Sequence, residues 1–187
     1  MTTTERSRRL DWRFLLWSPE LGRVLFAGPG NAALLAAMRE QAPSITLMEK
    51  KGARGTDDLF DGAVVSDADA SSLSTACDAL RPDGWLYVEC HPGGWLAGSR
   101  RARRWATLLK SLGMRDIEMF WHWPDFERCA EIIPLDHERA TELFVRRRLS
   151  GAGRAWKKRI LEGLWRCGWI GGLARSVSIV ARKAPSP

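Results

Sequence analysis

Short apolar runs alternate with amphipathic stretches along most of the chain. Runs rich in branched and aromatic residues predict strands, and apolar positions that recur every three or four residues predict helices. This pattern predicts strands over 22–27, 44–49, 61–66, 84–90 and 115–122, and helices over 31–41, 70–80 and 98–112. Because strands and helices take turns, the sequence predicts an α/β fold with a Rossmann-like, mostly parallel sheet and helices on both faces.

The pattern changes after residue 125. The segments that follow are an extended stretch at 130–136, a helix at 137–149, a Gly-rich break at 150–153, a second helix at 154–167 and a strand at 176–183. The last of these predicts a return to the sheet. At 187 residues and 45% hydrophobic content, the chain fits a single domain, 1–187, with a helical insertion at 125–175 before the last strand.

Two closely spaced glycines separate the first predicted strand from the first predicted helix, in the sequence Gly28-Pro29-Gly30-Asn31. Glycine lets the backbone approach a ligand closely, and the free N–H groups of the next helix favour polar or negative groups. Glu49 ends the next strand about twenty residues later, where dinucleotide-binding folds place an acid for a ribose hydroxyl. The arrangement favours a nucleotide-like cofactor over a plain chain reversal.

Polar residues follow two of the later predicted strands. Asp67 comes directly after strand 61–66, while Glu89 and His91 stand at the end of strand 84–90. Open α/β sheets present ligands at the carboxyl ends of their strands. His91 precedes a Pro-Gly-Gly loop, and imidazole suits a general base near neutral pH. Simple capping of that loop is the alternative for His91.

Two other segments carry chemistry-bearing side chains for which a structural role is favoured. The helix at 98–112 bears four arginines near its start, which we interpret as a solvated face. His122 lies among aromatic residues at the end of a strand and is interpreted as a core or edge histidine. Its neighbours Trp121 and Trp123 belong either to the core or to the wall of an acceptor pocket.

The positive charge belongs to the C-terminal part of the chain. The formal net charge is +7, and residues 137–187 hold twelve Lys or Arg against three acids, so the remainder is slightly acidic. This distribution favours a local anionic partner and argues against nucleic-acid binding by the whole protein. The basic, Trp-bearing helix at 154–167 either packs on the protein's own sheet or binds a membrane surface or a partner protein.

The four cysteines show no C-x-x-C pair and no regular spacing, so the sequence predicts neither a metal site nor a disulfide framework. The polar N-terminus has no apolar core of a secretory signal, and no segment has the uncharged length of a membrane span. We therefore expect a cytoplasmic protein, either free or peripheral at a membrane.

Together these pieces resemble the class I S-adenosylmethionine-dependent methyltransferases, over roughly residues 20–125 and 176–183. In that family a Gly-rich loop touches the methionine part of the cofactor, an acid after the second strand holds the ribose, and an acidic loop contacts adenine. The resemblance implies S-adenosylmethionine as cofactor and, as its binding residues, Gly28, Pro29, Gly30, Asn31, Glu49, Asp57, Asp58 and Asp67. It also implies that the last strand is antiparallel.

The chain departs from the family pattern at three points. Phe26 replaces the acid that usually stands two residues before the first glycine, and Ala32 replaces the third glycine. Only about a dozen residues separate Glu49 from the next predicted strand, so one strand and its flanking helix are missing or compressed.

The resemblance implies methyl transfer to a small molecule or biosynthetic intermediate, on oxygen, with His91 and Asp67 as candidate catalytic residues. The insertion at 125–175 would form the acceptor side of the site, and its charge would favour an acidic, phosphorylated or lipid-linked acceptor. Two alternatives stay open. One is a catalytically degenerate methyltransferase-like subunit that binds a partner protein or membrane surface through its C-terminal region, and the other is a nicotinamide-dependent oxidoreductase that uses the same loop.

Overall fold

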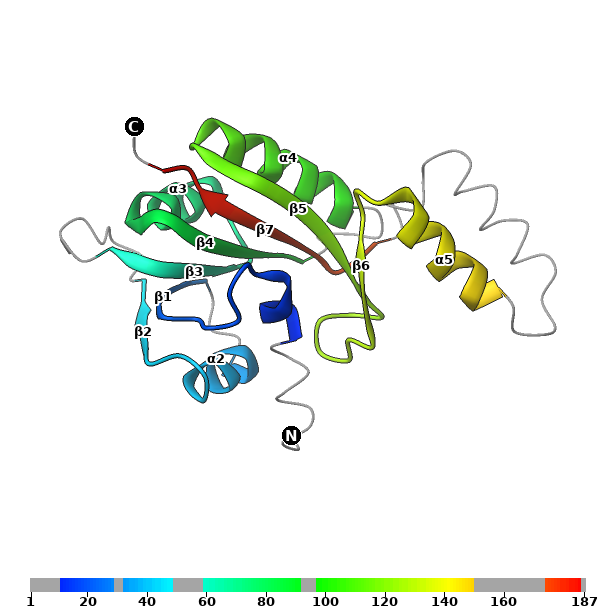
Figure 1. Ribbon diagram of the computed structural model, residues 1–187, viewed down its shortest axis with the longest axis horizontal. Helices are drawn as coiled ribbons and strands as arrows, with labels where there is room; N and C mark the ends of the chain where they lie inside the picture. Colours follow the sequence, from blue (N-terminus) through cyan, green and yellow to red (C-terminus); the bar gives the residue numbers. More distant parts are fainter. Residues whose placement is uncertain (1–10, 29–31, 49–58, 92–96, 150–173, 186–187) are drawn as a thin grey trace.

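A computed structural model describes residues 11–28, 32–48, 59–91, 97–149 and 174–185. Its elements, in chain order, are η1 (Asp11–Leu15), β1 (Arg23–Ala27), α2 (Ala32–Arg39), β2 (Ser44–Leu47), β3 (Phe60–Ser66), α3 (Ala70–Ala79), β4 (Leu80–Cys90), α4 (Ala97–Ser111), β5 (Met114–Trp123), β6 (Glu131–Pro134), α5 (Glu138–Leu149) and β7 (Val177–Lys183). Each strand and helix predicted within these ranges is present (Figure 1).

The strands form one seven-stranded sheet in the order β2-β1-β3-β4-β7-β5-β6. Strands β2, β1, β3 and β4 pair in parallel, whereas β7 is antiparallel to both of its neighbours, β4 and β5. The predicted fold class, a Rossmann-like sheet with an antiparallel final strand, is therefore confirmed. Figure 1 shows β7 running back between β4 and β5 with its arrow reversed.

At the two edges of the sheet, the sequence predicted the strands less completely than in the interior. On one side β2 is the outermost described strand, and residues 49–58, where the sequence predicts a missing or compressed strand, lie outside the described residues. On the other side β6 pairs antiparallel with β5, so the segment predicted only as extended is a strand of the sheet. Strand β4 begins at Leu80, earlier than predicted, because its first residues pair with β3 across a register shift between Phe60 and Gly62.

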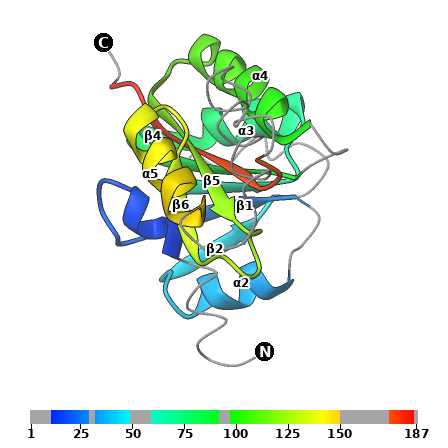
Figure 2. The ribbon, with the colours of Figure 1, turned by 90° about the vertical axis from the view of Figure 1, so that its right-hand side faces the viewer.

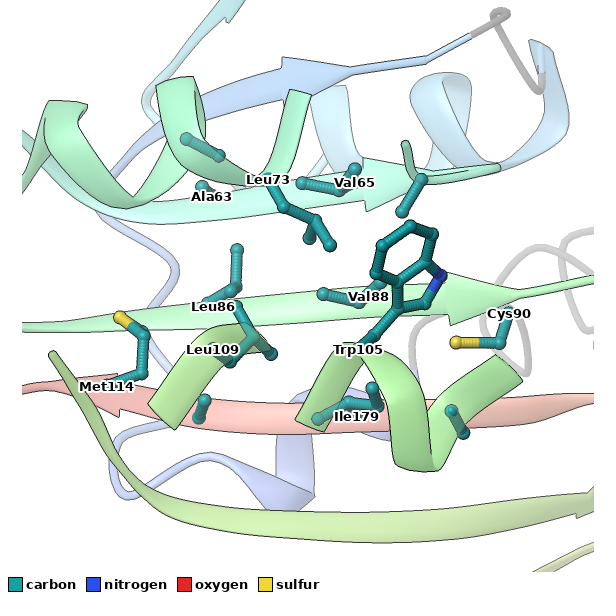
Figure 3. Close-up of a cluster of buried hydrophobic side chains, with 14 of the residues drawn as sticks. Ala63, Val65, Leu73, Leu86, Val88, Cys90, Trp105, Leu109, Met114 and Ile179 are labelled. Carbon is teal, nitrogen blue, oxygen red and sulfur yellow. The ribbon is translucent and has the colours of Figure 1, made fainter. Parts of the chain in front are cut away.

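Helices cover both faces of the sheet, as Figure 2 shows with α3 and α4 on one side and α2 on the other. On the α3/α4 side, Leu73, Trp105 and Leu109 point towards the strands and pack with Val65 and Val88 in one buried cluster (Figure 3). Burial of such side chains contributes roughly 1.5–3 kcal/mol each, so this layer is a main source of stability.

The apolar stretch at the N-terminus folds as η1 and packs against the second core cluster, on the α2 side. Trp12 is 2% exposed and stacks on Tyr87 of β4, with ring centroids 4.0 Å apart and an interplanar angle of 12°. It also contacts Trp85, at 5.8 Å between centroids. The anchor of this stretch therefore lies over a central strand of the sheet.

Alternation along β4 sends neighbouring side chains to opposite faces. Leu86, Val88 and Cys90 belong to the cluster under α3 and α4 (Figure 3), whereas Tyr87 belongs to the cluster under η1. Glu89 shares the face of Tyr87. Among the described helices, none has the length and apolar character needed to cross a membrane.

Candidate functional site

The carboxyl ends of three adjacent strands form the candidate site. The chain passes from β1 to β2 on one side and returns to β3 on the other, so the order of the sheet switches direction between β1 and β3. Ligands of open α/β sheets bind in the crevice outside such a switch point. Gly28, Asp67 and His91 directly follow β1, β3 and β4, so the structure brings these three predicted site residues to the same edge.

Gly28 makes the closest backbone approach at this edge. Its φ is +134°, and a Cβ at this position would lie 2.1 Å from the carbonyl oxygen of Ser66, the last residue of β3. No other residue type fits there without movement of the main chain. The first turn of the predicted Gly-rich loop is thus packed on the end of the neighbouring strand.

The other predicted cofactor-binding residues lie outside the described residues. These are Pro29, Gly30, Asn31, Glu49, Asp57 and Asp58. Strand β2 stays paired with β1 up to its end, because the amide of Met48, directly after β2, donates to the Phe26 carbonyl of β1 at 2.8 Å. Phe26 itself, which stands where the family usually has an acid, is 2% exposed in the core on the η1 side.

Asp67 occupies the first position after β3, with a left-handed backbone (φ 55°) and a half-exposed side chain. Its Oδ1 lies 3.4 Å from Nη2 of Arg101 on α4. The same guanidinium donates to the carbonyls of Ala68, at 3.0 Å, and His91, at 3.4 Å. Arg101 therefore ties the end of β3 to the end of β4.

This position of Arg101 corrects the interpretation of the α4 arginines as a solvated face. Arg100, Arg103 and Arg104 are exposed as expected, but Arg101 turns inward and is half-buried. A signal for this was present in the sequence, because Arg101 precedes the buried Trp105 by one helical turn and so shares its face of the helix. Arginine's planar fork suits the bridging of several oxygens.

Asp69, the next acid after β3, has a structural role. It is the N-cap of α3, where it accepts from the Ser72 amide at 2.7 Å while its own amide donates to the Ser72 hydroxyl at 3.0 Å. These hydrogen bonds hold the pKa of Asp69 below its usual value. Such a reciprocal cap stabilises the start of a helix.

His91 lies at the end of β4 beside a buried acid. Its Nε2 is 3.4 Å from Oε2 of Glu89, which is completely buried, while the His91 side chain is 38% exposed. The Tyr87 hydroxyl donates to the other oxygen of Glu89 at 3.4 Å. Phe126 packs edge-on against the His91 ring, with centroids 5.1 Å apart. A half-exposed imidazole backed by a carboxylate can accept a proton from a bound molecule.

Cys90, between these two residues, faces the opposite side of the sheet. It is 1% exposed, and burial raises the pKa of its thiol to about 12. A thiol in this state is neutral near pH 7 and is a poor nucleophile. Cys90 is therefore a core residue.

His122 is likewise a core histidine. It is 3% exposed, its Nε2 lies 2.8 Å from the Ser178 hydroxyl, and its Nδ1 lies 3.6 Å from the Cys129 sulfur. Trp121 is 4% exposed and packs edge-on against Phe144 in the cluster under α4, so it belongs to the core and not to a pocket wall. Among the described side chains, no three His, Cys, Asp or Glu gather as a metal site would require.

No protein-family model and no curated protein matches the sequence. Solved structures do. A SAM-dependent methyltransferase from Archaeoglobus fulgidus is similar with a TM-score of 0.54 and 13% identity, over 96% of this chain and 94% of that one. For a SAM-dependent methyltransferase from Thermotoga maritima the TM-score is 0.51 at 13% identity, over 96% and 89% of the two chains.

Phosphoethanolamine N-methyltransferase 2 from Haemonchus contortus, in complex with phosphomonomethylethanolamine and S-adenosylhomocysteine, has a TM-score of 0.53 and 15% identity. The match covers 96% of this chain but 53% of that one, so this chain spans about half of its length. At these identities the likeness is one of fold. With its switch point between β1 and β3 and its reversed β7, the chain has the fold of the class I S-adenosylmethionine-dependent methyltransferases.

Proposed function

We propose that this chain is an S-adenosylmethionine-dependent methyltransferase that acts on a small molecule or biosynthetic intermediate, on oxygen. The observation that carries the proposal is the contact of Gly28 with the Ser66 carbonyl. Because of this contact, position 28 at the switch point can hold only a residue without a side chain. A loop that cradles a nucleotide-like cofactor has the same requirement. The similar folds of known SAM-dependent methyltransferases support the same cofactor.

The residues that would hold the cofactor follow from the family resemblance. The loop Gly28-Pro29-Gly30-Asn31 would contact its methionine part and Glu49 its ribose. Asp57 and Asp58 would contact adenine, with Asp67 beside them. Of these, Gly28 and Asp67 lie within the described residues and stand at neighbouring strand ends.

Methyl transfer from a sulfonium is an in-line displacement, so holding donor and acceptor in line provides much of the acceleration. A base contributes when the acceptor must lose a proton, as a hydroxyl must. His91 is half-exposed at the same edge as Gly28, and it therefore supports an acceptor oxygen. Asp67 is the second candidate catalytic residue, since its carboxylate also reaches solvent at this edge.

The acceptor and partner predictions rest on the basic C-terminal region. An acidic, phosphorylated or lipid-linked acceptor fits its charge, and so does a membrane surface or partner protein at 154–167. Those residues lie outside the described ranges. Flotation with anionic liposomes tests the membrane contact. Charge-reversing substitutions at Lys157 and Lys158 would abolish flotation if the contact is real.

Calorimetry with S-adenosylhomocysteine, and separately with NAD, tests the proposal. Asp67→Asn removes the charge but keeps a residue that tolerates a left-handed backbone. We expect it to weaken S-adenosylhomocysteine binding at least fivefold, by about 1 kcal/mol, and Glu49→Ala to weaken it further. Asp116→Asn is the matched control, because Asp116 is also an exposed acid with positive φ, at the start of β5.

The outcomes separate the candidate functions. Binding of S-adenosylhomocysteine that is weakened by Asp67→Asn and unchanged by Asp116→Asn supports the methyltransferase. No binding of either compound favours the degenerate, partner-binding subunit, which the buried Phe26 in place of an acid would then explain. Binding of NAD alone overturns the proposal in favour of the oxidoreductase.

A further inference from the structure

The geometry points to a paired proton acceptor at the end of β4, in which buried Glu89 positions His91 and leaves Nδ1 of that ring as the atom that takes the acceptor's proton. This inference rests on the proposed methyltransferase function and deepens it. It adds Glu89 as a positioning residue for the candidate base and assigns the reactive nitrogen.

Glu89 is the penultimate residue of β4 and His91 directly follows the strand, and the two differ sharply in exposure. Glu89 is 0% exposed, whereas 38% of the His91 side chain reaches solvent. The imidazole can therefore meet a bound molecule, whereas the buried carboxylate reaches that molecule through the imidazole. In this respect the pair resembles the buried acid and accessible histidine of a catalytic triad.

The charge of the pair favours one tautomer. An ionised carboxylate only accepts hydrogen bonds, so a proton on the Nε2 that lies 3.4 Å from Glu89 Oε2 is stabilised there, whereas a lone pair on that nitrogen would face negative charge. In the neutral ring the lone pair then lies on Nδ1. The distance is slightly longer than that of an ideal hydrogen bond, as is common for catalytic contacts before substrate binds.

Both partners are held in place by their surroundings. The Tyr87 hydroxyl donates to Glu89 Oε1 at 3.4 Å, and Tyr87 is itself stacked under Trp12. Phe126 packs edge-on against the His91 ring, and Arg101 Nη1 donates to the His91 carbonyl at 3.4 Å. A catalytic group requires this kind of fixed geometry.

Glu89 is a carboxylate buried at the end of a largely apolar strand. Burial of a carboxylate carries a large desolvation cost, and apolar residues of similar size are often as stable or more stable at such positions. The residues around it in β4, 85–88 and Cys90, are apolar or aromatic, whereas its partners on β3 and β7 are the buried serines Ser66 and Ser178. A role for Glu89 in orienting His91 accounts for a carboxylate at this position despite its desolvation cost.

The pair supports removal of a proton while a methyl group is transferred to a hydroxyl oxygen. A lone pair of the acceptor hydroxyl oxygen forms the new bond to the methyl carbon. The carbon–sulfur bond breaks and its electron pair stays on sulfur, which gives S-adenosylhomocysteine. The hydroxyl proton passes to His91 Nδ1, and the carboxylate of Glu89 stabilises the resulting imidazolium.

Nitrogen NMR of the wild-type protein tests the tautomer directly. The chain has only three histidines, at 91, 122 and 137, so ring signals of ¹⁵N-histidine-labelled protein can be assigned with His91→Asn. At a pH where the ring is neutral, we expect the Nε2–H form of His91 to predominate by at least fivefold. A predominant Nδ1–H form, or an even mixture, would overturn the inference.

Carbethoxylation with diethyl pyrocarbonate tests the reactivity of the same nitrogen. We expect Glu89→Gln to slow modification of His91 at least fivefold while exposed His137 reacts at an unchanged rate in the same sample. Glu118→Gln is the matched control, since Glu118 is an exposed glutamate on another strand of the sheet. An unchanged His91 rate in Glu89→Gln would contradict the pairing. If Glu89→Gln fails to fold, the tautomer measurement on the wild type decides.

Failure of this inference can be told apart from failure of the proposed function. Glu89 is buried, so Glu89→Gln should leave S-adenosylhomocysteine affinity within twofold of wild type. Cofactor binding together with the wrong tautomer would discard the pair and keep the methyltransferase. The predicted tautomer in a protein that binds no S-adenosylhomocysteine would discard the methyltransferase, and with it the catalytic role of the pair.

Discussion

The α-carbon of Gly28 lies so close to the Ser66 carbonyl that a methyl group on it would stand 2.1 Å from the carbonyl oxygen. The obstacle is main chain from the end of β3, so a rotamer change cannot relieve it. The backbone of Gly28 also has a φ of +134°, which L-residues rarely adopt. Strain and steric overlap therefore act together at this position.

We expect Gly28→Ala to lower the free energy of unfolding by roughly 3 kcal/mol or more and to weaken S-adenosylhomocysteine binding. Gly113→Ala is the control, because Gly113 also has a positive φ (+77°) but nothing within 4 Å of a new Cβ. It should cost only about 1 kcal/mol of backbone strain. Urea unfolding of both variants measures the difference, and equal costs would show that the Ser66 contact does not matter.

Arg101 joins two strand ends, and its loss should loosen the candidate site. Arg101→Ala removes the donors to Ala68 and His91, so we expect a loss of about 1–2 kcal/mol in stability and a severalfold loss in S-adenosylhomocysteine affinity. Arg101→Lys should not restore either property, because one ammonium cannot span the same oxygens. Exposed Arg100 on the same helix is the control, and Arg100→Ala should change stability by less than about 0.5 kcal/mol.

Features that depend on the local sequence could be predicted, whereas features that depend on contacts between distant residues could not. The order of strands and helices follows from local periodicity, and so does the placement of Asp67 and His91 at strand ends. These features require no knowledge of which side chains meet.

The features that were missed depend on contacts between distant parts of the chain. The pairing of β6 with β5 could not be distinguished from an extended loop, because a single strand's sequence does not name its partner. The inward turn of Arg101 depends on the carbonyls of Ala68 and His91, which come from other segments. The contact between Glu89 and His91 depends on the burial of one and the exposure of the other, and alternation alone does not set either.

Trp12 fixes the N-terminal segment on the sheet, against Tyr87 of β4. Because it is 2% exposed and stacked on Tyr87, Trp12→Ala should cost about 3–5 kcal/mol. Trp17→Ala is the control, since Trp17 is 48% exposed and the Arg182 guanidinium lies over its ring, 5.7 Å from the centroid. That variant should cost less than about 1 kcal/mol. Thermal and urea unfolding of the pair check the difference, and a small loss for Trp12→Ala would contradict the anchoring role.

The buried thiol of Cys90 makes stability depend on alkaline pH. Burial raises its pKa from an ordinary value near 9 to about 12. Between these values the unfolded chain releases a proton that the folded chain keeps, so stability falls as the pH rises, by about 1.4 kcal/mol per pH unit for this thiol. Below pH 9 the contribution is fully present.

Cys90→Ala removes this thiol, so the decline of unfolding free energy between pH 9 and pH 10.5 should become shallower by about 1.4 kcal/mol per pH unit. Urea unfolding at several pH values measures the slope, which is independent of the constant cost of the cavity. Val88→Ala is the matched control, because it opens a cavity on the same face of β4 and leaves the thiol in place. It should lower stability equally at every pH. An unchanged slope in Cys90→Ala would show that the thiol ionises as readily in the folded protein as in the unfolded chain.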